Sequence, residues 1–351
     1  MKKALVSRTI VAVFAALWFI LSSQAQLTAL GTAEDEDEKS DELVIYAYDS
    51  FVSEWGPGPQ VVEKFEQRYG IPVRLESVGD AGQVLQKAIL EKDSPRADLI
   101  IGVDNNLLAR AKREGVLRPY KSPGLENVPA ELVFDPEGYI SPYDYGYFAI
   151  IYDSQKIDDP PASLEELTDQ RFEDQLILMD PRTSTPGLGF LMWTIAVYGD
   201  DFPSYWKRLE PSVLTISEGW DSGYGLFTNG EAAMVLSYTT SPAYHVEYEE
   251  SQRYRVALFE EGHYLQIEGM GILEHAANPE AAEKFIDFSL TEEFQAVIPL
   301  TNWMYPVLPE LELPDSYEYA PKPGKSLSFP GEKIAENRDR WIDQWLSTVT
   351  R

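Results

Sequence analysis

Beyond residue 42, short runs of apolar and β-branched residues alternate with longer stretches in which apolar positions recur at helical spacing. Strand-like runs occupy 43–48, 71–78 and 97–103, and each is followed by one such stretch. In the first of these stretches, Val62, Phe65 and Tyr69 fall on one face of a helix. A repeated strand–helix order of this kind predicts a sheet that contains parallel strands and is flanked by helices.

A second series of the same kind follows in the later part of the chain. Its strand-like runs occupy 147–153, 175–179, 232–238, 255–259 and 264–273. Ser163 and Glu166 form a capping-box pattern at the start of a short helix, and the closing helix places Ile334, Trp341 and Trp345 on related faces. Because no long flexible linker separates the two series, we expect an α/β protein of two lobes that share crossover strands, with a cleft between them.

The first 25 residues have the three parts of a secretory signal peptide. The positive part holds Lys2, Lys3 and Arg8, an apolar run follows at 9–21, and a small-residue cleavage site ends at Ala25. A retained membrane anchor would need about 20 apolar residues, and this run is shorter, so we expect cleavage. Residues 26–42 are rich in acidic side chains and are expected to form a disordered tether.

Charge and cysteine content limit the possible partners. The formal net charge is −29, and loss of the three cations of the signal peptide would take it to −32. Such an acidic chain repels nucleic acid and anionic lipid, so neither is expected as a partner. The chain has no cysteine, which excludes disulfides, lipid attachment at a processed cysteine and a cysteine nucleophile.

No catalytic or metal-binding pattern is evident in the sequence. The three histidines, His245, His263 and His275, do not have the spacing of a metal site. The chain also lacks the G-x-S-x-G motif of a serine nucleophile and the lysine of a phosphate-binding loop. The sequence therefore favours a binding protein over an enzyme.

Polar and aromatic residues follow the first two predicted strands. Tyr48, Asp49 and Trp55 come directly after the first strand, and Asp80 follows the second at the start of a helix. Open α/β sheets bind ligands at the carboxyl ends of their strands. Packing of Trp55 over its turn and simple helix capping by Asp80 are the structural alternatives.

Aromatic residues also gather at loop positions in the second series. GWDSGYG contains Trp220, SYTTSPAYH contains Tyr238 and Tyr244 beside three hydroxyls, and TNWMYP contains Trp303. Each ring alone is more typical of a protein core, but together they suggest a cage for a cationic or aromatic molecule. A separate stretch, DPRTSTPGLG, places Ser184 and Thr185 at a strand-to-helix junction. Those hydroxyls could hold a phosphate or simply cap the helix.

Several of these stretches, taken in order, resemble the periplasmic thiamine-binding proteins of bacterial ABC importers. The resemblance runs from about residue 43 to the C-terminus and is carried by YDSFVSEWGPGP, GVDNNLL, DYGYFAIIYD, DPRTSTPGLG, VYGDD, SYTTSPAYH, EGHYLQIE and NWMYP. It implies a type II periplasmic binding protein in which each lobe is a mixed sheet flanked by helices. It also implies that the lobes close on thiamine, thiamine monophosphate or thiamine diphosphate, and that the ligand passes to a membrane permease coupled to an ATPase.

The resemblance assigns roles residue by residue. The aromatic positions around the ligand correspond to Tyr48, Trp55, Trp220, Tyr238, Tyr244 and Trp303. Asp80 matches the acidic loop position, although Ala81 stands where the family has glycine. The hydroxyl positions correspond to Ser184, Thr185, Thr239, Thr240 and Ser241. In this reading a phosphate on the ligand would be held at Ser184 and Thr185 and would not be cleaved.

We expect residues 43–150 and 262–351 to form the first lobe and residues 151–261 the second. The protein should be a periplasmic monomer that needs no cofactor beyond its transported ligand. A thiamine-degrading transferase of the same fold is disfavoured because it would need a cysteine. A ferric ion or polyamine site is the remaining alternative, with Tyr143, Tyr145 and Tyr147 as candidate iron ligands, although their spacing also suits packing in an extended segment.

Overall fold

The computed structural model describes residues 42–349. The signal peptide predicted at 1–25 and nearly all of the tether predicted at 26–42 therefore lie outside the described residues. Among residues 42–349, no helix is both long enough and apolar enough to cross a membrane.

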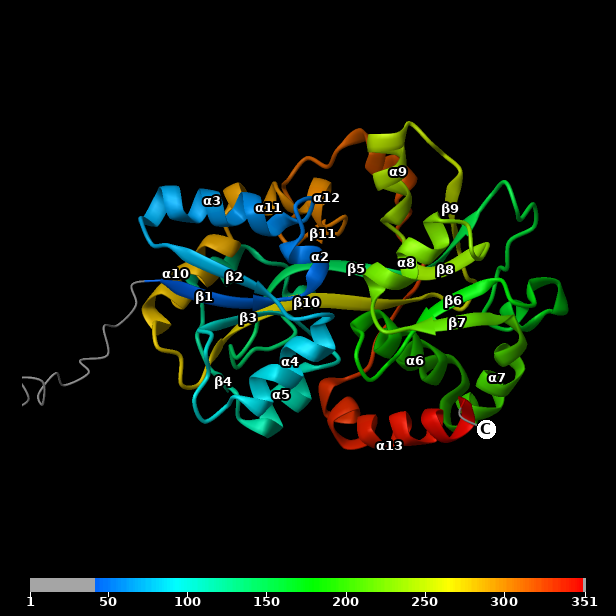
Figure 1. The fold of residues 1–351 in the computed structure, drawn as a ribbon, viewed down its shortest axis with the longest axis horizontal. Helices are drawn as coiled ribbons and strands as arrows, with labels where there is room; N and C mark the ends of the chain where they lie inside the picture. The colour runs from blue at the N-terminus through cyan, green and yellow to red at the C-terminus, as the bar shows by residue number, and fades with distance from the viewer. Residues whose placement is uncertain (1–41, 350–351) are drawn as a thin grey trace, which may run out of the picture. The chain divides into compact units, whose positions relative to one another are not determined.

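The strands form one connected mixed sheet (Figure 1). Their order along the main path is β2-β1-β3-β10-β5-β8-β6-β7, and four short strands pair beside this path. The bounds are β1 (Leu43–Ala47), β2 (Val73–Ser77), β3 (Leu99–Asp104), β4 (Leu117–Arg118), β5 (Ser141–Asp153), β6 (Leu176–Met179), β7 (Val213–Ser217), β8 (Met234–Tyr238), β9 (Tyr254–Ala257), β10 (His263–Leu273), β11 (Tyr305–Pro306) and β12 (Ser326–Leu327). Pairing is parallel for β1 with β2 and β3, for β6 with β7 and β8, and for β10 with the short β12. The other pairs of β5 and β10 are antiparallel.

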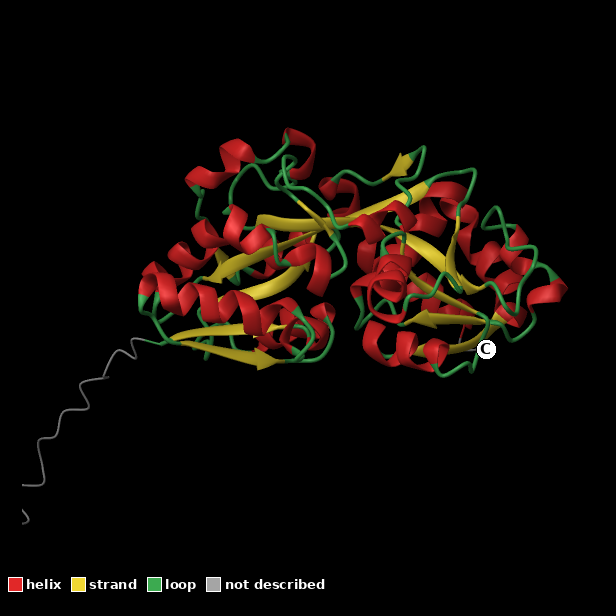
Figure 2. Cartoon of the chain, turned by 90° about the horizontal axis from the view of Figure 1, so that it is seen from above, coloured by secondary structure: helices red, strands yellow, loops and turns green. Residues whose placement is uncertain are grey.

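Helices lie on both sides of these strands (Figure 2). The first lobe contains β1 to β4 and the helices α2 (Asp49–Val52), α3 (Pro57–Tyr69), α4 (Ala81–Leu90), α5 (Leu108–Glu114), α10 (Pro279–Ser289), α11 (Glu292–Gln295) and α12 (Ile298–Thr301). The second lobe contains β6 to β9 and the helices α6 (Thr185–Tyr198), α7 (Phe202–Leu209), α8 (Trp220–Thr228) and α9 (Ser241–Glu249). Short 3-10 helices occupy Pro123–Asn127, Ala130–Leu132, Glu166–Thr168, Gln170–Phe172, Gly199–Asp201, Glu210–Ser212 and Asp315–Tyr319.

Two long strands, β5 and β10, connect the lobes (Figure 1). The first part of β5 pairs with β10, up to Tyr147 opposite Leu265. From Phe148 onward, β5 pairs instead with β8 and β9 of the second lobe. One continuous strand therefore links the two lobes, and its backbone is paired with strands of the sheet in each of them. The predicted α/β architecture of two lobes with shared crossover strands is therefore confirmed.

Local sequence explains where the helices near the cleft begin and end. Helix α3 starts with a proline in its first turn and ends at Gly70, whose φ of +67° suits the left-handed conformation of a helix terminus. Helix α6 is almost entirely buried, which matches its apolar sequence. The pattern at Ser163 works differently from a full capping box. Its hydroxyl accepts from the amide of Glu166, but the Glu166 carboxylate accepts from Ala162, and only a 3-10 helix follows.

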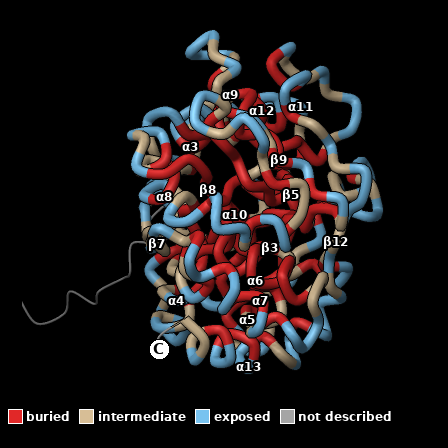
Figure 3. Tube along the Cα trace, turned by 90° about the vertical axis from the view of Figure 1, so that its right-hand side faces the viewer, coloured by how far each residue is buried: buried red, intermediate tan, exposed pale blue. Residues whose placement is uncertain are grey.

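The core fills the space between the sheet and the helices, and the chain is buried along most of the central strands (Figure 3). The last helix, α13 (Gly331–Val349), packs against α5 of the first lobe and α7 of the second. Ile334, Trp341 and Trp345 are buried, as its periodicity predicts. Trp345 meets Trp206 of α7 edge to face, with ring centroids 5.8 Å apart. The closing helix therefore contacts both lobes, and its buried side chains are the apolar ones that the sequence spacing predicts.

Candidate ligand-binding site

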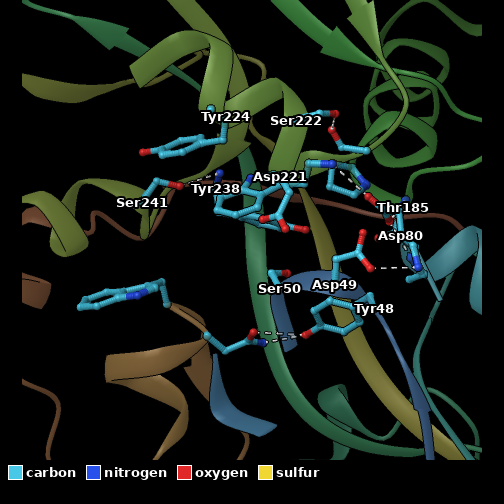
Figure 4. Close-up of a pocket in the computed structure, with 18 of the residues that line it drawn as sticks. Tyr48, Asp49, Ser50, Asp80, Thr185, Asp221, Ser222, Tyr224, Tyr238 and Ser241 are labelled. Carbon is cyan, nitrogen blue, oxygen red and sulfur yellow. Dashed lines mark hydrogen bonds between the residues drawn. The ribbon is translucent and has the colours of Figure 1, made fainter. Parts of the chain in front are cut away.

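A pocket of about 620 Å³ lies between the lobes, and Figure 4 shows many of the side chains that line it. Its first-lobe wall comes from the loops after β1 and β2, and its second-lobe wall from the starts of α6, α8 and α9. Seven aromatic residues line it: Tyr48, Trp55, Trp220, Tyr224, Tyr238, Tyr244 and Trp303. The pocket thus lies at the carboxyl ends of strands, where open α/β sheets place ligands.

The charged residues of the pocket are all acidic. Six carboxylates line it, those of Asp49, Asp80, Glu218, Asp221, Glu249 and Glu268. No lysine, arginine or histidine is among the lining residues of the described chain. The low-dielectric walls of a pocket strengthen the field of such a set of like charges. The site therefore attracts a cation and repels an anion, except where backbone dipoles reverse the local potential.

Asp80 lies where three helices begin. It precedes α4 in the first lobe, and its Oδ1 accepts from the amide of Ala81 at 2.7 Å. The same carboxylate accepts from two second-lobe amides, Thr185 at the start of α6 (3.3 Å) and Trp220 at the start of α8 (3.0 Å). Burial raises the pKa of Asp80 above its ordinary value, and these amide hydrogen bonds oppose that rise. Asp80 is thus both a helix cap, one alternative from the sequence, and a direct bridge between the lobes.

The loop before α6 approaches the first lobe closely. Ser184 caps α6, because its Oγ accepts from the amide of Gly187 at 3.4 Å. The neighbouring Thr183 carbonyl lies so near Gly82 that a Cβ added there would be only 2.3 Å from its oxygen. Gln83 also donates to Glu218 across the lobes at 2.7 Å. Glycine at position 82 is therefore what allows α4 to approach this loop.

Aromatic stacking positions the ring of Trp220. Its indole lies parallel to Tyr224, with centroids 4.8 Å apart, and its Nε1 donates to Ser237 at 2.8 Å. Behind it, the Tyr224 hydroxyl and Nε2 of His245 lie 2.9 Å apart, and Nδ1 of His245 lies 2.8 Å from Glu249. Burial lowers the pKa of His245, against the raising effect of Glu249. This hydrogen-bonded chain holds the stacked pair in one orientation.

Trp303 has an unusual backbone conformation. Its φ is +55°, in the left-handed region that side chains other than glycine seldom adopt. Its ring meets Tyr244 of α9 edge to face at 5.4 Å, so the first lobe contacts the second here as well. Such strain persists only where surrounding contacts hold it, and it is common at ligand sites. The Trp303 side chain is buried, whereas Trp55, which also lines the pocket, is 50% exposed.

Glu268 lies at the pocket surface on β10, near the hinge. Its Oε2 accepts from Tyr48 (2.9 Å) and Tyr143 (2.7 Å), and its Oε1 accepts from Gln266 at 3.1 Å. Asn302 also lines the pocket, and its Nδ2 lies 3.0 Å from the Tyr48 hydroxyl. Burial raises the pKa of Glu268 to about 7, although the two tyrosine hydroxyls act to lower it.

Ten of the thirteen residues predicted for the site line this pocket together: Tyr48, Trp55, Asp80, Ala81, Thr185, Trp220, Tyr238, Ser241, Tyr244 and Trp303. Ser184, Thr239 and Thr240 are not among its lining residues. Ser184 faces its own helix as a cap, and the side chains of Thr239 and Thr240 are fully buried after β8. A direct part for any of these residues in ligand binding remains a prediction.

The sequence prediction missed several residues that line the pocket, among them Ser50, Asp221, Tyr224, Glu268 and Asn302. Tyr224 stands four residues after Trp220 in the GWDSGYG stretch, so helical spacing could have pointed to it. Asp221 lies in the same stretch but does not have that spacing. Burial and the charges of Asp49 and Asp80 raise the pKa of Asp221 to about 6. Glu268 had a weaker signal, because it is the one carboxylate in the strand-like run YLQIEGMGIL.

The tyrosines considered for iron do not converge on one point. Tyr143 bonds to Glu268, whereas Tyr145 stacks on Tyr305 with centroids 5.3 Å apart. The ammonium of Lys322 lies 4.6 Å from the centroid of the Tyr305 ring. Across residues 42–349, no group of three or more histidine or acidic side chains is arranged to hold a metal ion. In the described structure Tyr143 thus hydrogen-bonds Glu268, and Tyr145 packs against Tyr305 and Tyr147.

Comparison with known proteins gives a consistent result. Residues 94–338 match the family described as bacterial extracellular solute-binding protein. The thiamine-binding periplasmic protein of Brucella melitensis is 44% identical over 90% of this chain and 94% of its own length. Its counterpart from Escherichia coli is 42% identical over 88% of this chain and 94% of its own length. A solved structure described as a periplasmic thiamin binding protein matches with a TM-score of 0.84 and 40% identity, covering 88% of this chain and 96% of that one.

Proposed function

The chain belongs to the family of bacterial extracellular solute-binding proteins that includes the periplasmic thiamine-binding proteins, and from this premise we propose that it binds thiamine in the pocket between its lobes. It then delivers the ligand to the membrane permease of an ABC importer. We further propose that it acts as a periplasmic monomer and catalyses no reaction. The absence of cysteine supports the last point, because the transferase alternative would need a cysteine nucleophile.

The observation that carries this proposal is the composition of the pocket wall. Six carboxylates and seven aromatic rings line it, with no basic side chain among the described lining residues. Thiamine combines a permanently positive thiazolium ring with a flat aminopyrimidine. A cation over an aromatic face gains about 0.5–2 kcal/mol, most where water is excluded. The wall is therefore complementary to this ligand in charge and in aromatic character.

We propose that binding draws the lobes together about β5 and β10. In this proposal residues 43–150 and 262–351 move as one lobe and residues 151–261 as the other. The ligand can shift the lobes toward the closed arrangement only as far as it binds that arrangement more tightly. Asp80, Gly82 and Trp303 all contact the opposite lobe, so ligand contacts and lobe contacts form in the same place.

Thiamine monophosphate and diphosphate are proposed ligands as well. Their phosphate would take the amides of Thr185 and Trp220 at the starts of α6 and α8, because helix N-termini favour anions. Asp80 now accepts from both amides. A phosphate there must either displace this carboxylate or bind while it is protonated, and burial already raises its pKa. The phosphorylated ligands should therefore bind less tightly at high pH than thiamine does.

Isothermal titration calorimetry with thiamine and its two phosphates tests the proposal. We expect a single site for thiamine with a dissociation constant in the nanomolar range, or about −12 kcal/mol. Choline, a cation without a flat ring, and benzoate, a flat anion, serve as controls and should bind far more weakly. Equal binding of choline and thiamine would contradict an aromatic cage, and absence of thiamine binding would overturn the proposal.

A further inference from the structure

Three carboxylates occupy the same level of three neighbouring strands. In the pairing of β10 with its two neighbours, Glu268 stands opposite Asp104 of β3 on one side and Asp144 of β5 on the other. Asp104 and Asp144 are fully buried, and Glu268 is 5% exposed and lines the pocket. We name Asp104, Glu268 and Asp144 the carboxylate row. It crosses the sheet beside the point where β5 passes from one lobe to the other.

A bulge lies beside the row in each flanking strand. In β3 the register skips Gly102, whose φ is +107° and whose added Cβ would lie 2.7 Å from the Tyr48 ring. In β5 the register skips Tyr143, whose hydroxyl bonds Glu268 at 2.7 Å. Bulges redirect side chains and are common beside functional sites. Tyr143 lies in the β5 bulge, and the missing Cβ of Gly102 leaves room for the Tyr48 ring, so both hydroxyls bond the same oxygen of Glu268.

The hydrogen bonds of the row do not neutralise it. Asp104 accepts from the side-chain amides of Asn106 and Gln266, and Asp144 accepts from Asn302 at 2.5 Å. Oδ1 of Asp144 is buried without any hydrogen-bond partner in the described structure. Within residues 42–349, none of the three carboxylates forms a salt bridge. All of their hydrogen-bond partners are neutral amides and hydroxyls, and the buried guanidinium of Arg338 in α13 acts on Asp104 through its charge without a salt bridge.

Three buried anions at one level of a sheet are unfavourable. Like charges directly opposite each other destabilise a strand pair, and a buried charge without a counter-ion tends to take up a proton. Burial and the charge of Glu268 raise the pKa of Asp144 well above its ordinary value. Burial raises the pKa of Asp104 to about 6, against the lowering effect of its amide partners. The row therefore takes up protons at a higher pH than isolated carboxylates do.

We propose that Glu268, with Asp144 and Asp104 behind it, selects the positively charged ligand, and that the carboxylate row releases a proton when that ligand binds. This inference rests on the proposed function and adds to it the residue that discriminates by charge. The exchange balances, because one ligand cation enters the pocket as up to one proton passes from the row to solvent. A neutral ligand leaves the protons in place and gains nothing from the row.

Other ionisable groups near Glu268 can influence this exchange, and they come from every element packed around it. They are Tyr48 after β1, Asp80 at α4, Tyr143 and Asp144 of β5, Tyr238 of β8 and Asp104 of β3. Arg338 of α13 and Tyr264 of β10 act on Asp104, and Tyr317 acts on Asp144. The tyrosines remain protonated near neutral pH because burial raises the pKa of each well above its ordinary value. Asp80 and Asp221 also line the pocket and have raised pKa values. Loss of the proton release in Glu268→Gln is therefore the observation that assigns the proton to the row.

Calorimetry in two buffers of different ionisation enthalpy measures the released proton directly in the wild-type protein. The probes are thiamine and its neutral aminopyrimidine half, and the variant is Glu268→Gln. We expect thiamine to release a substantial fraction of one proton near pH 7 in the wild type and almost none in the variant. We also expect the variant to bind thiamine about 30-fold more weakly, while its affinity for the pyrimidine changes by less than about threefold. Glu131→Gln, an exposed site outside the pocket, controls for the change in net charge.

The results separate the inference from the proposed function. Wild-type protein that binds thiamine without releasing a proton between about pH 6 and pH 8 would overturn the inference and leave the function standing. The same holds if Glu268→Gln weakens thiamine and the pyrimidine equally, because a charge-selecting residue must discriminate between them. If Glu268→Gln does not fold, the wild-type proton measurement still decides. Absence of thiamine binding to the wild type would overturn both.

Discussion

Two acids that line one pocket, Asp80 and Glu268, both have pKa values raised by burial, yet their surroundings differ. Asp80 accepts from backbone amides at the starts of three helices. Glu268 accepts from neutral hydroxyls and an amide and stands between two further carboxylates. The positive ends of the helix dipoles stabilise the first charge, whereas within residues 42–349 the second forms no salt bridge.

The difference means that the two acids favour different groups of a bound ligand. At the Asp80 end an incoming anion can compete for amides that already hold an anion. At Glu268 an incoming cation supplies the positive charge that the residues bonded to this carboxylate do not provide. A ligand with a cation at one end and a hydroxyl or phosphate at the other can satisfy both ends only in one orientation. The predictions below alter one end or the other, from the largest expected effect to the smallest.

Gly82→Ala should have the largest effect, because the added Cβ would meet the Thr183 carbonyl oxygen at 2.3 Å. Alanine favours the helix, so the first lobe itself should not lose stability. We expect thiamine affinity to fall about 100-fold because the lobes cannot approach fully. Titration gives the affinity, and small-angle scattering shows whether saturating thiamine still compacts the protein.

Gly331→Ala is the matched control for that variant, since a Cβ at this helix start meets nothing within 4 Å. It should bind like the wild type. Normal affinity in Gly82→Ala would show that the contact between α4 and the loop before α6 is not needed for binding.

Stability should depend on pH in the direction set by Glu268. Its pKa is about 7 in the folded protein and about 4.3 in an unfolded chain. Between these values the folded state binds more protons, so the free energy of unfolding falls as pH rises. We expect the protein without ligand to lose on the order of 2 kcal/mol between about pH 5 and pH 8, measured by urea unfolding at constant ionic strength. Glu268→Gln should lose less over the same interval, and an equal loss in both proteins would assign the effect to other groups.

Trp220→Ala removes the ring that stacks on Tyr224 at the Asp80 end. Thiamine affinity should fall at least about tenfold while the fold is kept, as fluorescence titration and circular dichroism can show. Trp55→Ala is the comparison, because that ring is 50% exposed and should contribute less. Wild-type affinity in Trp220→Ala would count heavily against an aromatic cage.

Asp80→Asn should have the smallest effect. It should change the preference between thiamine monophosphate and thiamine more than it changes the affinity for thiamine. The neutral amide competes less with phosphate for the amides of Thr185 and Trp220, so the affinity for thiamine monophosphate relative to thiamine should rise about fivefold. Competition calorimetry measures this ratio. A ratio that falls would mean that Asp80 itself holds the phosphorylated ligand, for example through a shared proton.

Much of the fold follows from local pattern. Alternation of strand-like and helical stretches predicts the two α/β series, and apolar spacing predicts the buried face of α13 with Trp341 and Trp345. Part of the candidate site could be predicted from the sequence in the same way. Aromatic and hydroxyl residues after strands mark one edge of the sheet, and ten of the thirteen predicted residues meet there.

The sequence by itself determined the types of element, the residues at their ends and the acidic, cysteine-free composition, because each depends on the spacing and chemistry of neighbours along the chain. Only the tertiary structure decided that Asp104, Glu268 and Asp144 share one level, since strand register and bulges at Gly102 and Tyr143 set that alignment. It also decided that Asp80 reaches amides more than a hundred residues away in the other lobe. A buried charge depends on what surrounds it in space, and those neighbours come from strands and helices far apart in the chain.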